Sequence, residues 1–152
     1  MFTSPRDRLL NRKVLLQPLG YSGTPLIRKL GINSGMRVYL HRPPTGYLEL
    51  LGPDIAGVKR SKICRGLFDM VQIFATSRAE LEGELIRFRD HIVQAGMIWV
   101  SWPKKRSGVT TDVTEDVIRE ICLPMQLVDV KVCAIDTTWS GLKLVIRREA
   151  RK

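Results

Sequence analysis

Residues 68–102, FDMVQIFATSRAELEGELIRFRDHIVQAGMIWVSW, decide the fold of this 152-residue chain. Residues 70–75 are almost continuously apolar, which is typical of a strand buried on both faces of a parallel sheet. Residues 97–102 have the same character. Ser77-Arg78-Ala79-Glu80 forms a capping box, which predicts that a helix starts directly after the first strand. The stretch therefore predicts two adjacent parallel strands joined by a helix that crosses one face of the sheet.

The helix of this unit is predicted from the spacing of its apolar residues. Leu81, Leu85, Phe88 and Ile92 recur every three or four positions, as on the buried stripe of an amphipathic helix. Gly96 follows this run, and glycine commonly ends a helix. We therefore expect the helix to continue to Ala95-Gly96.

Further elements flank this unit on both sides. On the N-terminal side we expect a short helix capped by Thr24, a strand at 37–41, a helix at 47–51 capped by Thr45, and a polar edge strand within 58–63. On the C-terminal side Thr114 predicts another helix start, followed by strands at 127–135 and 142–147. The connection at 136–141 suits an antiparallel hairpin.

This alternation predicts an α/β fold: a three-layer, Rossmann-like, mostly parallel sheet of about five to six strands that ends in an antiparallel hairpin. We expect a single such domain over residues 20–152. Residues 1–19 are predicted to form a flexible basic N-terminal arm, because termini are often poorly ordered.

Composition limits the classes of protein that fit. An apolar fraction of 44% is ordinary for a globular domain, and no apolar run approaches the roughly 18 residues of a membrane span. Three cysteines without CxxC spacing and without a secretory signal predict reduced thiols in the cytoplasm. No Cys or His pair has zinc-ligand spacing, so we expect no metal site.

Positive charge is concentrated in one part of the sequence. The chain carries a net charge of +10, of which residues 1–65 contribute +9. An anionic small molecule, a nucleic acid or an acidic protein would be attracted to such a region. The alternative is a solvated basic face that affects only solubility.

Several segments resemble a bacterial family of small uncharacterised proteins, a domain of unknown function. They are Gly20-Tyr21-Ser22-Gly23-Thr24-Pro25, Gly46-Tyr47-Leu48-Glu49-Leu50-Leu51-Gly52, Phe74-Ala75-Thr76-Ser77-Arg78-Ala79-Glu80-Leu81, Trp99-Val100-Ser101-Trp102-Pro103-Lys104-Lys105, Asp129-Val130-Lys131-Val132-Cys133-Ala134 and Trp139-Ser140-Gly141-Leu142-Lys143. The resemblance covers roughly residues 20–148. It implies a bacterial origin and brings no established activity.

The strand-helix-strand at 69–102 and the closing hairpin also resemble, more distantly, the corresponding parts of class I methyltransferases. The resemblance implies a truncated form of the methyltransferase fold. This resemblance implies S-adenosylmethionine as a possible cofactor. Such enzymes carry a Gly-rich turn after the first strand and an acid at the end of the second. Here the turn is Arg42-Pro43-Pro44-Thr45-Gly46 and the second region, 59–65, has no carboxylate. The motifs for the cofactor are therefore missing, and the implied fold does not by itself imply the function.

Ligands of open parallel sheets bind beyond the carboxyl ends of the strands. Four predicted loops meet there, at 41–47, 76–78, 102–106 and 136–139. The candidate ligand-binding residues on them are Tyr47, Ser77, Arg78, Trp102, Lys104, Lys105, Asp136 and Trp139. Ser77 also fits a simple helix cap, and one of Trp99 and Trp102 is expected in the core. Asp136 is the best-placed carboxylate for acid/base chemistry but has no partner in the sequence, so no catalytic residue is predicted.

Three functions remain open from the sequence. The first is a non-catalytic domain with a degenerate methyltransferase-like fold that binds an anionic ligand or a protein partner. The second is a methyltransferase with an atypical site for S-adenosylmethionine. The third is a nucleic-acid-binding protein, which the basic half favours although no helix-turn-helix or zinc-finger motif is present. Whether the chain is an enzyme is left undecided.

Overall fold

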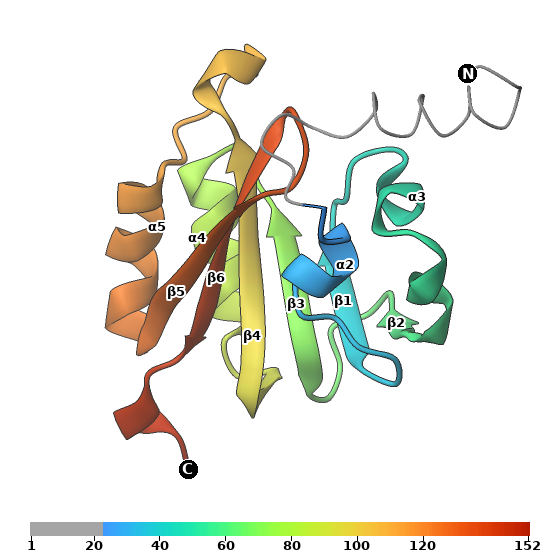
Figure 1. The fold of residues 1–152 in the computed structure, drawn as a ribbon. Helices are drawn as coiled ribbons and strands as arrows, with labels where there is room; N and C mark the ends of the chain where they lie inside the picture. The colour runs from blue at the N-terminus through green and yellow to red at the C-terminus, as the bar shows by residue number, and fades with distance from the viewer. Residues whose placement is uncertain (1–22) are drawn as a thin grey trace, which may run out of the picture.

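A computed structural model describes residues 23–152 as a central sheet with helices on both faces (Figure 1). The strands lie in the order β2-β1-β3-β4-β6-β5. The first four strands in this order are parallel to one another, and the last two are antiparallel to their neighbours. Their bounds are β1 (Arg37–His41), β2 (Lys59–Ser61), β3 (Phe68–Phe74), β4 (Ile92–Pro103), β5 (Leu127–Ala134) and β6 (Trp139–Ile146). The predicted fold class is thus confirmed, whereas the arm predicted at 1–19 lies outside the described residues.

Helices form the two outer layers. The short helices α2 (Leu26–Lys29) and α3 (Tyr47–Leu51) cover one side of the sheet, which we call the front face, and the longer helices α4 (Arg78–Phe88) and α5 (Glu115–Cys122) cover the back face (Figure 1). Short 3-10 turns lie at Pro53–Gly57, Lys105–Ser107, Leu123–Met125 and Arg148–Ala150. No helix within residues 23–152 is long and apolar enough to cross a membrane.

The apolar core is divided by the sheet into two clusters. Successive side chains of a strand point to opposite faces, so Met70 and Phe74 of β3 pack in the front cluster while Val71 and Ile73 pack in the back cluster. β3 and β4 pair in parallel with Val71 opposite Ile98. This parallel pair, with α4 on its back face, is the unit predicted from residues 68–102.

The capping predictions are half correct. The Ser77 hydroxyl accepts a hydrogen bond from the Glu80 backbone N–H (3.1 Å), and Thr114 does the same for Val117 (3.1 Å), as predicted for α4 and α5. Thr24 and Thr45 do not cap: α2 begins after Pro25 and α3 after Gly46, and neither helix has a side-chain cap. Both helices are short and are held by tertiary contacts instead of by a capping hydroxyl.

The predicted C-terminal end of α4 is wrong. The helix ends at Phe88, and Ile92, expected on its last turn, is the first residue of β4. Spacing alone misled the prediction, because Ile92 is buried in the same cluster as Phe88 although it lies on a strand. Gly96 lies instead at an irregularity of the β3–β4 pairing, where an added Cβ would come within 2.9 Å of the Val93 carbonyl oxygen.

Two details of β4 and the hairpin also differ from the predictions. Trp99 and Trp102 point to opposite faces, yet both are buried, Trp99 in the front cluster and Trp102 in the back cluster. Strand β6 begins at Trp139 instead of residue 142, because the last residues of the expected loop pair with β4, with Trp139 opposite Pro103.

Truncation of a buried side chain of α4 should be far more destabilising than truncation of an exposed one. Leu85 is completely buried, whereas Ile86 is 62% exposed. We expect Leu85→Ala to lower the free energy of unfolding by about 2–5 kcal/mol, the usual range for a buried leucine. Ile86→Ala, the matched control, should change it by less than about 0.5 kcal/mol. Urea unfolding monitored by circular dichroism would measure both, and equal effects would contradict the described orientation of α4.

Candidate functional site

A buried hydrogen-bond chain fastens α3 to the sheet. The Tyr47 hydroxyl donates to Gln72 Oε1 (2.6 Å), and Gln72 Nε2 donates to Ser101 Oγ (3.0 Å). Gln72 and Ser101 are wholly buried within β3 and β4. Burial raises the pKa of Tyr47 far above its ordinary value, so the hydroxyl stays protonated and remains a donor.

Aromatic side chains fill the space around this chain. The Tyr47 and Phe74 rings meet edge to face at 4.8 Å between centroids, and Phe74 meets Trp139 at 5.2 Å. Tyr47 is only 2% exposed. The structure thus connects two predicted site residues, Tyr47 and Trp139, through Phe74. Their contacts pack the front face next to the end of β3 and leave the phenol no surface for a ligand.

His41, at the end of β1, contacts two carboxylates of α4. Its Nε2 lies 3.2 Å from Glu80 Oε2 and its Nδ1 lies 3.4 Å from Glu84 Oε1. Arg42 also pairs with Glu80, at 3.0 Å. The backbone of Arg42 is left-handed, with φ of 52°, so the chain turns here in a conformation that glycine adopts more easily. Both ring nitrogens of His41 are therefore engaged with α4 on the back face.

Asp136 lies in the hairpin loop and is occupied by backbone contacts. Its Oδ1 accepts hydrogen bonds from the N–H groups of Thr138 (2.8 Å) and Trp139 (2.7 Å). Such an Asx turn shapes the loop. The backbone N–H of Lys104 donates to the Thr138 carbonyl (2.7 Å), which joins two of the predicted loops. Within the described residues, no acid or histidine side chain is hydrogen-bonded to Asp136.

The remaining predicted site residues lie on the back-face side. Ser77 caps α4, and the Arg78 guanidinium pairs with Glu120 of α5 at 2.7 Å. Trp102 and Lys105 line a separate open depression of about 450 Å³ beside the start of α5. The predicted residues are therefore distributed over both faces of the sheet and do not surround one cavity.

The described residues contain no activated nucleophile of a familiar kind. Burial raises the pKa of the Cys122 thiol to about 11 and also raises that of Cys133, so both remain protonated at neutral pH. His41 contacts carboxylates and His91 contacts the Gly66 carbonyl, so neither activates a hydroxyl or thiol. No cluster of three His, Cys, Asp or Glu side chains within residues 23–152 could hold a metal ion.

An open groove lies beside the short edge strand β2. We call it the edge groove; it has a volume of about 510 Å³ and is lined by Tyr39, Leu40, Pro43, Leu48, Val58, Arg60, Ser61 and Lys62. β2 pairs with β1 only as far as Tyr39, so β1 continues for Leu40 and His41 without a neighbour on that side. The early end of β2 thus opens a space at the carboxyl ends of β1 and β2, where ligands of parallel sheets bind.

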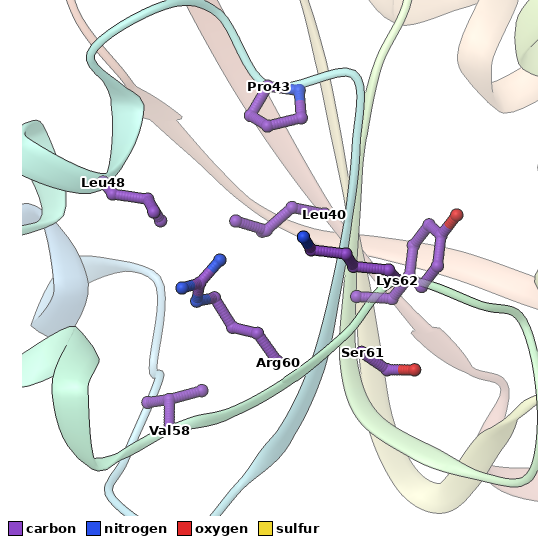
Figure 2. Close-up of a pocket in the computed structure, with 8 residues that line it drawn as sticks. Leu40, Pro43, Leu48, Val58, Arg60, Ser61 and Lys62 are labelled. Atoms are coloured by element: carbon purple, nitrogen blue, oxygen red, sulfur yellow. The ribbon is translucent and has the colours of Figure 1, made fainter.

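The charge lining the edge groove is entirely positive. Arg60 and Lys62 point their charged groups toward the opening between Leu40 and Leu48 (Figure 2). Within residues 23–152, neither cation has a carboxylate within 4.0 Å. Other depressions on the surface include acids, Asp54 in one and Glu115 with Asp116 in another. The edge groove is therefore suited to attract an anion.

Sequence reasoning missed the residues that line this groove, apart from the loop that contains Pro43. The sequence predicts a polar edge strand within 58–63 and a basic region without a carboxylate at 59–65, but it does not predict that these residues line a groove. The available indication was the alternation of Arg60 and Lys62 on a short polar strand, which places both side chains on one side of it. The contribution of Leu40 and Leu48 depends on the early end of β2, which the sequence does not mark.

Comparison with solved structures shows likeness to methyltransferases. The ribosomal protein L11 methylase of Lactobacillus delbrueckii is 12% identical, with a TM-score of 0.55 over 81% of this chain and 76% of that one. The N-methyltransferase NodS of Bradyrhizobium japonicum is 11% identical, with a TM-score of 0.53 over 81% and 93%. Magnesium protoporphyrin IX methyltransferase of Synechocystis, solved with bound S-adenosylmethionine, is 11% identical, with a TM-score of 0.54 over 79% and 74%.

These similarities concern the fold. The expected likeness to class I methyltransferases is thus confirmed for the architecture of the sheet and its antiparallel end. No family model matches the chain, and no curated protein matches it. Membership of the bacterial family of uncharacterised proteins stays a prediction.

Removal of the Tyr47 hydroxyl should destabilise the protein, because the carboxamide oxygen of buried Gln72 would lose its donor. We expect Tyr47→Phe to lower the free energy of unfolding by about 1–3 kcal/mol. In a Gln72→Leu background, Tyr47→Phe should lower the free energy of unfolding clearly less, since the acceptor of the Tyr47 hydroxyl is already absent. Denaturant unfolding of the four proteins of this cycle would measure the coupling, and additive effects would contradict the described hydrogen bond.

Proposed function

We propose that this chain is a non-catalytic binding domain with a degenerate methyltransferase-like fold, and that it binds an anionic ligand in the edge groove. The observation that carries the proposal is the pair of cations Arg60 and Lys62, which have no carboxylate partner within residues 23–152 and lie at the carboxyl ends of β1 and β2. A cleft at this edge of a parallel sheet is the usual position for a ligand. Its lining includes no acid to repel an anion or to neutralise the two cations.

The charge of the groove argues against S-adenosylmethionine as its ligand. The resemblance to class I methyltransferases implies an acid at the end of the second strand, to hold the ribose hydroxyls of the cofactor. Here Arg60 and Lys62 stand at that end. They carry donors but no acceptor for hydroxyl groups, and they repel the positively charged sulfonium. An anion would be attracted by the same two side chains.

The contacts around the carboxyl ends of the strands support the same view. A turn rich in glycine would let the backbone approach a cofactor closely, but here Arg42 pairs with Glu80 and Tyr47 is buried against Gln72. His41 is engaged by two carboxylates, and Asp136 is occupied by backbone N–H groups. These contacts leave no evident general base beside the groove.

A methyltransferase with an atypical cofactor site is the second candidate, and the likeness to solved methyltransferases favours it.

A nucleic-acid-binding protein is the third candidate, and the basic residues 59–65 favour it. Four cations of this segment have no carboxylate partner within residues 23–152: Lys59, Arg60, Lys62 and Arg65. Binding measurements with S-adenosylmethionine and with nucleic acid distinguish these two candidates from an anion-binding domain.

Thermal-shift measurements with a panel of ligands test the proposed function. We expect at least one anionic class, among nucleotides, acyl-CoA thioesters and alkyl phosphates, to raise the melting temperature in a saturable way. The shift should be largely lost in the double variant Arg60→Ala/Lys62→Ala. It should persist in Arg148→Ala, a matched control that removes an exposed cation near the C-terminus.

Three results would contradict this function. Saturable stabilisation by S-adenosylmethionine together with methyl transfer would establish the second candidate. Tight, salt-sensitive binding of RNA or DNA, lost in the same double variant, would establish the third. Absence of stabilisation by every anion in the panel would also refute the proposal.

A further inference from the structure

The uncharged part of the edge groove is mainly aliphatic. Leu40, Pro43, Leu48 and Val58 surround the opening into which the two cations point (Figure 2). Leu40 and Leu48 are only partly buried, and they pack against the front cluster from its edge. They therefore expose aliphatic surface that an apolar ligand group could cover, and its removal from water would favour binding.

The groove lacks the contacts that recognise a nucleobase. Its only aromatic side chain is Tyr39, whose ring already packs against Phe88 at 4.7 Å and Phe68 at 5.7 Å in the back cluster. A base would therefore lack a free ring on which to stack. The Ser61 hydroxyl is occupied by the backbone of Ile63, with its Oγ 2.9 Å from that carbonyl oxygen. Apart from the Tyr39 hydroxyl, no other uncharged polar side-chain group of residues 23–152 lines the groove.

The cations and the aliphatic surface face the same opening. Arg60 can present a planar pair of N–H groups to a phosphate or carboxylate, and Lys62 adds a second positive charge. The charged groups of both lie close to Leu40 and Leu48 (Figure 2). A ligand that satisfies both kinds of surface has an anionic head joined directly to an aliphatic chain.

We infer that the edge groove binds an anionic amphiphile, a single aliphatic chain that ends in a phosphate or carboxylate. This inference rests on the proposed function and names the ligand class of the same groove. The head lies between Arg60 and Lys62, and the first part of the chain lies along Leu40, Pro43 and Leu48. The volume of about 510 Å³ is in the range of small-molecule sites, roughly 300–1,000 Å³.

Isothermal titration of the full chain with four defined probes tests this inference. Dodecyl phosphate, below its critical micelle concentration, carries both head and tail. Butyl phosphate keeps the head with a short tail, dodecyl maltoside keeps the tail with a neutral head, and ATP supplies phosphates with a base. We expect dodecyl phosphate to bind at least about tenfold more tightly than each of the others, which corresponds to about 1.4 kcal/mol.

Two variants locate the binding. The double variant Arg60→Ala/Lys62→Ala should lower the affinity for dodecyl phosphate by about tenfold or more. Because both side chains are exposed, this variant should fold normally. Arg148→Ala should bind like the unmodified chain. Vesicles of phosphatidylcholine with phosphatidic acid distinguish a free amphiphile from a bilayer surface, and we expect no co-sedimentation with them.

The possible failures are distinguishable. If ATP binds as tightly as dodecyl phosphate and depends on Arg60 and Lys62, the inference fails while the proposed function stands. If dodecyl maltoside binds equally well, the head group is not recognised and the inference fails. If the protein binds the vesicles but not the free probe, the inference fails in favour of a membrane surface. If no anion binds at all, both the inference and the proposed function fail.

Discussion

The structure depends on burying both faces of the parallel strands β3 and β4. Their inner residues are apolar on each side, so each face needs its own covering layer. The back layer is built from α4 and α5, which bring long apolar stripes. Among residues 23–152, the helices of the front layer are α2 and α3, with four and five residues, lengths at which isolated helices are unstable. They hold their places through buried hydrogen bonds, from Trp99 Nε1 to the Leu30 carbonyl (2.9 Å) and from Tyr47 to Gln72.

This front layer decides where a ligand can bind. Because Tyr47 reaches into the sheet to satisfy Gln72, its ring and that of Phe74 fill the space beside the end of β3. The contact that stabilises α3 therefore closes the central position of the sheet to a bound molecule. Space remains at the side, since β2 has three residues and ends before β1 does. The short edge strand and the anchored α3 together move the open surface from the middle of the sheet to its edge.

The sequence predicts the architecture better than the site. Continuous apolar runs identify β3 and β4 because burial on both faces leaves no polar alternation, and Ser77 and Thr114 mark helix starts through local hydrogen bonds. The end of α4 is mispredicted because Ile92 is buried although it lies on a strand. The site residues are harder to predict because their partners are distant: Arg78 pairs with Glu120, and the groove combines Leu48 of α3 with Arg60 of β2.

Charge pairing differs between the back face and the edge of the sheet at β2. Cations on the back face are largely neutralised: Arg119 contacts Glu115, Asp116 and Asp129, and Arg87 pairs with Glu84. The cations from Lys59 to Arg65 have no such partners among residues 23–152. Their field therefore remains uncompensated where β2 ends, and the low-dielectric wall formed by Leu40 and Leu48 strengthens it locally. The structure thus places two cations that have no carboxylate partner among residues 23–152 beside an aliphatic groove, and this juxtaposition, more than the net charge, distinguishes the edge from the rest of the described surface.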